Sequence, residues 1–224
     1  MAAITVPDKE KKALGELANL PGSRLSSLIE SLRSAQATLL VRDLAAQVAP
    51  KAEMEEREVL RFIRLLATMY AVRTREGLSV EHFADEIYRA AEEGGLQLDP
   101  ETRERFKRYL QELLSIESLF VTAKALEISR EHEHVLCEPR IITDMRPIFG
   151  LNDEAVAVVP VHVLRLAYHV GSTDPETKEF FVALTSDNVR DLKKLAIRAE
   201  AKERKLKALA DKLNWLWLER KADE

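Results

Sequence analysis

The sequence predicts an α+β, mainly helical fold: an N-terminal helical bundle, then a three-stranded antiparallel meander, then one long C-terminal helix. Three changes in the spacing of apolar residues lead to this expectation. The spacing is helical, in steps of three and four, from residue 8 to about residue 131. After residue 135 it alternates, as in half-buried strands, and after Ser186 it is helical again. We therefore expect two domains, a helical bundle in residues 1–135 and a β-meander with a long helix in residues 136–224.

Five to seven helices are expected in the bundle, and residues that cap or stop helices mark their ends. The first runs from Asp8 to Asn19, and Ser23 is the expected N-cap of the second. A third, short helix ends near Pro50. The longest covers Glu53 to Arg75, where Gly77 stops it.

Two more helices complete the bundle. Ser79 is the expected cap of one, which ends at Gly94-Gly95. Asp99-Pro100 opens the other, because a proline in the first turn loses only an N–H that would be unpaired there. Its apolar stripe continues to about Arg130, so we expect one helix over this whole stretch.

Three short strands are expected in the second domain. They cover Val135–Phe149, Val156–Val170 and Phe180–Leu184, with Gly171–Lys178 as the loop before the last strand. Successive strands with short links pair antiparallel, which predicts a meander.

The final helix is expected to begin at the cap residue Ser186 and to end near Arg220. Its 35 residues would span about 50 Å, whereas the strands are only about 20 Å long. Such a helix cannot lie wholly on the sheet of its own chain, so we expect part of it to pack against another surface.

The same helix carries an apolar seam with heptad spacing, typical of a coiled coil. Seven of its eight seam positions are apolar, the exception being Lys202. The expected interface residues are Leu192, Leu195, Ala199, Leu206, Leu209, Leu213, Leu216 and Trp217. This seam either packs within its own chain or mediates self-association through the helix, the sheet or both. We expect a homodimer that forms through the meander and the helix.

The last third of the chain resembles the COMM-domain proteins. The similar residues are Pro160–Leu166, Phe180–Leu184 and Val189–Leu192 with Leu195. The C-terminal module of that family has the same strand-strand-strand-helix order. The resemblance implies an obligate dimerisation unit in a protein that acts as an adaptor rather than as a catalyst, and it implies no ligand-binding residue.

One stretch has the residue types of a metal site. On an extended backbone His132 and His134 would face the same side, as paired zinc ligands often do, and Cys137 could add a thiolate. A complete site would need a further ligand, such as Asp144 or Asp153. The alternative function is therefore a metal-binding domain or a metal-dependent enzyme centred on His132, His134 and Cys137. The alternative without metal is a polar junction between a helix and a strand.

The overall charge disfavours a dedicated nucleic-acid-binding protein. Lys and Arg number 34 against 38 Asp and Glu, for a net charge of −4. The C-terminal helix departs from this balance, because it has ten basic residues against six acidic ones. A nucleic-acid-associated regulator that binds through Lys193–Lys207 is thus a further alternative, against the simpler interpretation of a solvated helix face.

The remaining features favour a cytoplasmic, non-catalytic protein. The single cysteine cannot form an intramolecular disulfide, the N-terminus lacks a secretory signal, and polar residues interrupt the longest apolar stretch, Ala155–Val170. Phosphate-binding glycine loops and common catalytic motifs are absent from the sequence. We expect a protein-interaction scaffold without a cofactor and without a membrane span, whose helical domain binds a protein that the sequence does not identify.

Overall fold

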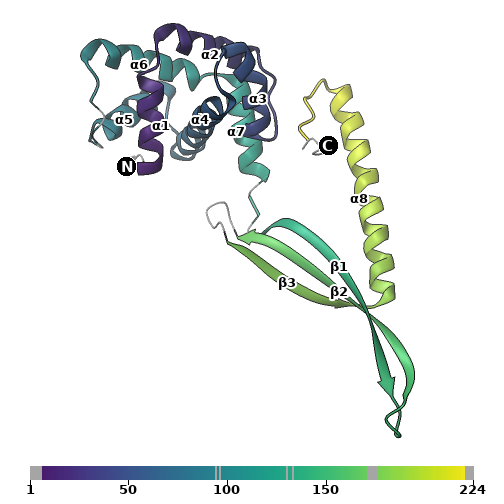
Figure 1. Cartoon of the computed structure of the whole chain (residues 1–224). Coiled ribbons are helices and arrows are strands. Elements are labelled where there is room, and N and C mark those ends of the chain that lie inside the picture. Colours follow the sequence, from purple (N-terminus) through teal and green to yellow (C-terminus); the bar gives the residue numbers. More distant parts are fainter. Residues whose placement is uncertain are drawn as a thin grey trace. The chain divides into compact units, whose positions relative to one another are not determined.

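A computed structural model describes residues 7–93, 95, 97–129, 131–132, 134–170 and 176–219. It confirms the α+β, mainly helical architecture (Figure 1). The chain divides into two compact units, one built from residues up to Ser129 with the last residues from Leu218, and the other from Arg130–Trp217. The first unit contains α1 (Asp8–Ala18), α2 (Gly22–Ser34), α3 (Val41–Ala52), α4 (Glu56–Glu76), α5 (Val80–Glu93), α6 (Pro100–Leu113) and α7 (Glu117–Ser129). The second unit contains β1 (His134–Phe149), β2 (Ala155–Val170), β3 (Thr177–Leu184) and α8 (Ser186–Lys212).

The helical unit is organised around α4, which packs against α1, α3 and α7. Its apolar residues recur on most sides of the helix, so α4 is buried along most of its length, with Phe62 and Leu66 fully enclosed. The expected end signals of two elements are confirmed. Gly77 ends α4 in the left-handed conformation, with φ of 65°. Asp99 caps α6 by accepting hydrogen bonds from the N–H groups of Glu101 and Thr102.

Two expectations for the helical unit are wrong. Helix α2 begins at Gly22, directly after Pro21, so Ser23 lies inside the helix and does not cap it. The single helix expected from Asp99 to about Arg130 is instead two helices, α6 and α7, with a turn at residues 114–116. The turn is stable because side chains of α4 bind the carbonyl groups that it exposes, as described in the Discussion.

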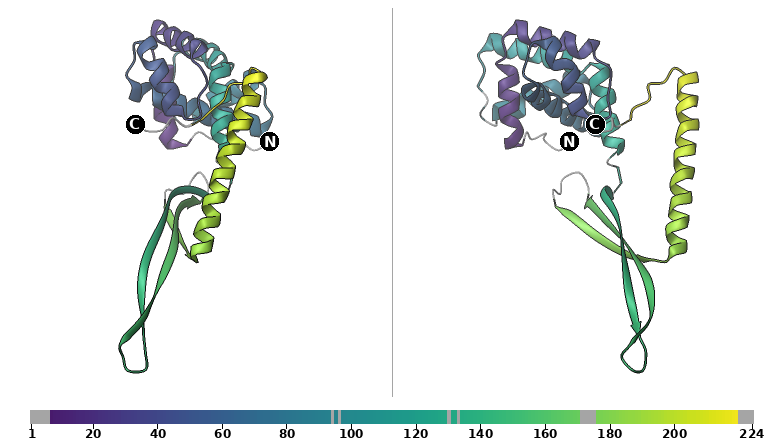
Figure 2. Two further views of the ribbon diagram at one scale, coloured as in Figure 1. Left: turned by 90° about the vertical axis from the view of Figure 1, so that its right-hand side faces the viewer. Right: turned by 45° about the vertical axis from the view of Figure 1, so that its right-hand side comes forward.

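The three strands form an antiparallel meander in the order β1-β2-β3, as expected. β1 pairs with β2 along nearly its whole length, whereas β3 covers only His162–His169 of β2. Beyond that point β1 and β2 continue as a two-stranded ribbon to their connecting turn (Figure 2). β3 starts at Thr177, earlier than expected, and residues 171–175 of the predicted loop lie outside the described part of the chain.

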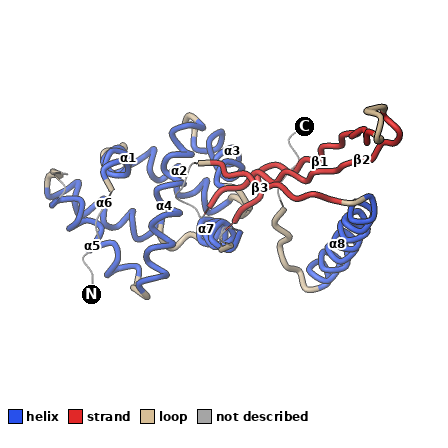
Figure 3. Tube along the Cα trace, turned by 90° about the horizontal axis from the view of Figure 1, so that it is seen from below, coloured by secondary structure: helices blue, strands red, loops and turns tan. Residues whose placement is uncertain are grey.

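Helix α8 differs from expectation at both ends. Its N-cap is Thr185 rather than Ser186, because Thr185 and Asn188 form a reciprocal capping box. It ends at Lys212 rather than near Arg220, because Asn214 adopts the left-handed conformation with φ of 54°. The Trp215 N–H then bonds the Ala210 carbonyl oxygen at 2.9 Å, which closes a Schellman motif. Helix α8 (Figure 3) has 27 residues, which corresponds to about 40 Å, whereas the 16 residues of β1 extend for about 53 Å. The expectation of short strands that cannot accommodate the final helix is therefore wrong, because β1 and β2 are both longer than α8.

No helix in the described ranges is both long enough and apolar enough to span a bilayer.

Candidate interaction surface

The two units differ sharply in the burial of their apolar side chains. Of the buried apolar residues in the described part of the chain, all but Ala167 and Ala210 lie in the helical unit. Of the large apolar side chains that are exposed, all but Phe120 and Ile128 lie in the second unit, which exposes twenty of them. The second unit thus has strands and a helix but almost no hydrophobic core.

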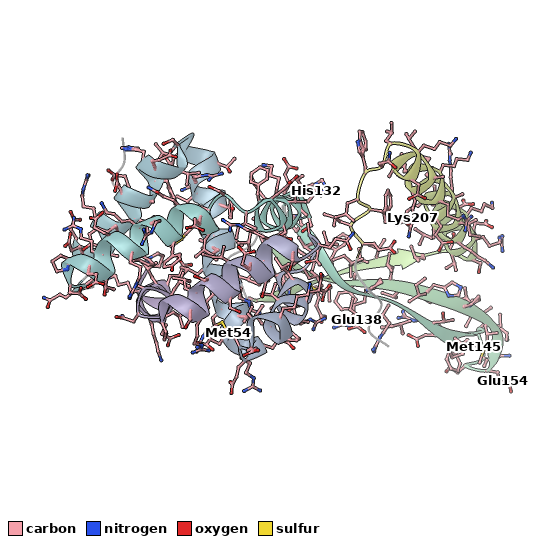
Figure 4. All side chains as sticks on the ribbon, turned by 90° about the horizontal axis from the view of Figure 1, so that it is seen from above. Met54, His132, Glu138, Met145, Glu154 and Lys207 are labelled. Carbon is pink, nitrogen blue, oxygen red and sulfur yellow. The ribbon has the colours of Figure 1, made fainter. Side chains whose placement is uncertain are left out.

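The strand register assigns the residues of the sheet to two faces, because directly paired residues project to the same side. One side, here named the apolar face, carries His134, Leu136, Pro139, Ile141, Thr143, Met145, Pro160, His162, Leu164, Leu166, Tyr168, Val170, Lys178, Phe180, Val182 and Leu184. Ile141, Leu164 and Val182 form one row across all three strands, and Pro139, Leu166 and Phe180 form the next. Figure 4 shows Met145 toward the turn of the ribbon. Its side chain is 72% exposed. The apolar face thus has the composition of one half of a hydrophobic core, and the other half is missing.

The opposite side, here named the charged face, carries an ion-pair network across the strands. Arg165 binds Glu179 on β3 and lies 3.6 Å from Glu138 on β1, which also accepts from Arg140 at 3.2 Å. The hydrogen bond from Arg165 lowers the pKa of Glu179 and raises the pKa of Arg165. The same side also exposes four large apolar side chains, those of Ile142, Ile148, Val159 and Phe181. The two faces therefore differ in their charged residues, while both expose apolar surface.

One polar side chain lies in the middle of the apolar face. The Nδ1 atom of His162 is 2.8 Å from the hydroxyl of Thr143 on β1, and its Nε2 atom is 3.4 Å from the hydroxyl of Ser186 at the start of α8. His162 therefore connects β1, β2 and α8 at the point where β3 ends.

Prolines occupy the open edges of the sheet. Pro139 and Pro147 lie on β1, whose outer edge has no neighbouring strand in the described chain, and Pro160 lies on the part of β2 that β3 does not cover. Proline has no N–H to donate to an added strand. Pairing of further strands along these edges is therefore weakened, and the faces remain as the surfaces available for association.

Helix α8 presents the predicted seam to solvent. Leu192, Leu195, Ala199, Leu206 and Leu209 lie along one side of the helix, since their positions repeat every three or four residues. Leu195 is 61% and Leu206 is 57% exposed. The views in Figures 1 and 2 agree that α8 leaves the end of β3 and does not lie across the sheet.

The seam is shorter than predicted. Leu213 is the C-cap of α8, and Leu216 and Trp217 come after the helix has ended. The reason is the left-handed Asn214, which redirects the chain before these residues. The helical part of the seam thus spans three heptads rather than four. Lys202 is the one charged residue in it.

The side of α8 opposite the seam is rich in basic residues, but acids are interleaved with them. Arg190 pairs with Asp187, and Lys194 pairs with Asp191 at 2.9 Å, each one turn apart. This arrangement is typical of a solvated helix face and does not by itself indicate a phosphate-binding surface.

The three candidate metal ligands lie at the start of β1. His132 lies in the bend before the strand, the ring of His134 packs edge-on against Tyr168 at 4.8 Å, and exposed Cys137 lies at a β-bulge between Leu136 and Glu138. Within the ranges that the structure describes, which omit Glu133, no three His, Cys, Asp or Glu side chains form a group that could hold a metal ion.

A shallow hollow of the helical unit lies between α4 and α7 and has a cavity volume of only about 10 Å³. It is lined by Tyr70, Phe120 and Ala123, with Lys124 and Glu127, an ion pair, at its rim. Pockets that enclose small-molecule ligands are commonly about 300–1,000 Å³, so this hollow is smaller than such sites.

The sequence pattern identified the seam of α8, and within single strands it also separated the apolar face from the other side. The alternation in β1 groups Ile141, Thr143 and Met145, and the alternation in β3 groups Phe180, Val182 and Leu184. What was missing was the register that places them in common rows.

No model of a known protein family matches the chain, and no curated protein matches its sequence. The resemblance of its last third to the COMM-domain module stays a prediction.

Proposed function

We propose that this chain is a non-catalytic interaction scaffold that homodimerises through its second unit. The observation that carries the proposal is the contrast in burial: among its described residues, this unit exposes twenty large apolar side chains and buries two apolar residues, both alanines. Leaving such surface in water is costly, at about 25 cal/mol per Å² of apolar area. A second copy offers a matching apolar surface on every exposed element.

The size of this surface fits a stable dimer. Standard interfaces involve about 20–30 residues on each partner, and obligate homodimers resemble a domain core cut in half. The second unit has this character, because its apolar residues are arranged in rows on the sheet and in a seam on α8.

The proposed contact joins the seam of α8 in one copy to the apolar face of the other. The 16 residues of β1 extend for about 53 Å, which is long enough to receive a helix of about 40 Å. Two such contacts related by a two-fold axis would enclose both seams. Prolines at the open edges favour this face-to-face arrangement over addition of strands.

The helical unit supplies the scaffold's second function in this proposal. It has a complete core of its own, so it can present a constant surface to another protein while the second unit joins the copies. We propose a protein partner for it, in agreement with the expectation from the sequence.

Size-exclusion chromatography with light scattering measures the mass of the full chain in solution and so tests whether it is a dimer. Wild type should have twice its chain mass of 25.4 kDa at micromolar concentration. The double variant Leu195→Glu/Leu206→Glu should be monomeric, because it places two charges in the seam. Ile197→Glu is the matched control: Ile197 is 52% exposed on the opposite side of α8, so this variant should remain dimeric.

A wild-type mass of 25.4 kDa at tens of micromolar would reject the proposed dimer. If Ile197→Glu dissociates the protein as completely as the double variant, the seam is not the contact surface.

A further inference from the structure

We infer that protonation of His162 controls the proposed self-association, so that the dimer dissociates in acid. This inference rests on the proposed function, because it needs the apolar face to be covered by a second copy. It starts from the position of His162, a titratable side chain in the central strand of the sheet, where the neighbouring rows of the apolar face are apolar.

The neutral imidazole suits this position. Its two nitrogens face the hydroxyl groups of Thr143 and Ser186, and a hydroxyl can donate to one nitrogen or accept from the other. Neutral His162 can therefore be covered by apolar side chains without leaving a polar atom unpaired.

The protonated imidazole has no compensating charge nearby. Leu184, its partner on β3, is apolar, and Asp144 and Arg165 project from the charged face. On α8, Asp187 lies next to Ser186 but is paired with Arg190. The described residues of the apolar face include no carboxylate.

The other titratable groups of the apolar face are distant. His134, Tyr168 and Lys178 lie toward the opposite end of the sheet. His134 pairs with Val170, eight residues along β2 from His162, which corresponds to about 27 Å. The seam offered by a second copy contains Lys202 and no acid. A charged His162 would thus be desolvated without a counter-ion when the dimer forms.

The expected effect follows from linkage. Histidine ordinarily titrates near pH 6.5, and the dimer contains two copies of the residue. If only the neutral form dimerises, the dissociation constant should increase about 100-fold between pH 7.5 and pH 5.5.

Sedimentation velocity of the full chain at pH 7.5 and pH 5.5, at constant ionic strength, measures this change. His162→Gln keeps a neutral hydrogen-bonding side chain, so its dissociation constant should change less than about threefold. His162→Lys carries a charge at both pH values and should be dissociated at both. His169→Gln is the control on the charged face, and it should keep the full pH response of wild type. Circular dichroism checks that each variant remains helical.

The outcomes separate the inference from the proposed function. A wild-type chain that is monomeric at pH 7.5 rejects the dimer itself. A dimer whose affinity is equal at both pH values, or a pH response that persists in His162→Gln, overturns the role of His162 and leaves the dimer standing. Tight dimerisation of His162→Lys at pH 7.5 also overturns it.

Discussion

Replacing Tyr70 by phenylalanine should destabilise the helical unit by removing one hydroxyl group. Tyr70 is 2% exposed on α4, and its hydroxyl lies 2.9 Å from the carbonyl oxygen of Leu113 and 3.0 Å from that of Ile116. Arg73 donates to the third carbonyl oxygen of this corner, that of Leu114, at 2.7 Å. These contacts hold the turn between α6 and α7 against α4.

The free energy of unfolding should fall by about 0.5–1.5 kcal/mol, the usual net value of one hydrogen bond. The penalty is no larger because the carbonyl oxygens of Leu113 and Ile116 keep backbone donors, the N–H groups of Ile116 and Phe120. Unfolding entropy is about 2.1 cal/mol/K per residue, which gives about 0.25 kcal/mol/K for a unit of roughly 120 residues. The Tm of the helical unit should therefore fall by about 2–6 °C.

Thermal melts followed by circular dichroism measure this shift in the full chain. Tyr109→Phe is a matched control, because the Tyr109 hydroxyl bonds only at 3.3 Å to the exposed hydroxyl of Ser26. Its Tm should stay close to that of wild type. Equal melting of Tyr70→Phe and Tyr109→Phe would refute the reasoning, since the corner would then not depend on the buried hydroxyl.

Three further predictions concern pH and helix ends. Burial raises the pKa of Tyr70 to about 12, against about 10 in the unfolded chain, so this contribution to stability is present below pH 10 and is lost as pH rises toward 12. Wild type should accordingly lose Tm more steeply than Tyr70→Phe in alkaline melts, and parallel slopes would contradict this. Hydrogen bonds from Thr102 hold the pKa of Asp99 below its usual value, so the stability from this cap is present at neutral pH and is lost in acid. Asp99→Ala should lower the Tm at pH 7 and weaken its dependence on pH below 4, and an unchanged acid slope would contradict the cap's role. Asn214→Ala should extend α8, because alanine disfavours the left-handed conformation, and slower amide exchange at Trp215 to Trp217 would show it. Unchanged exchange there would mean that Asn214 does not set the end of the helix.

The elements whose signals are local were predictable. Gly77 and Asp99 mark helix ends by their own backbone conformation or side-chain hydrogen bonds, and the structure uses both as expected. The end of α8 also has a local signal in Asn214, but asparagine is only sometimes left-handed, and the helical pattern on both sides obscured it.

The break between α6 and α7 could not be predicted in the same way. Its carbonyl groups accept additional hydrogen bonds from Tyr70 and Arg73, which are more than 40 residues away in the sequence. Apolar spacing continues through the turn, so periodicity alone indicates one helix.

The sequence by itself determined the fold class, the order of the elements and the apolar seam of α8, because these depend on spacing within single segments. Only the tertiary structure decided that the seam and the apolar face of the sheet remain exposed while the helical unit encloses its own core. The physical reason is that burial depends on which elements pack together and in what register. That information lies in contacts between distant residues, such as the rows that join β1, β2 and β3.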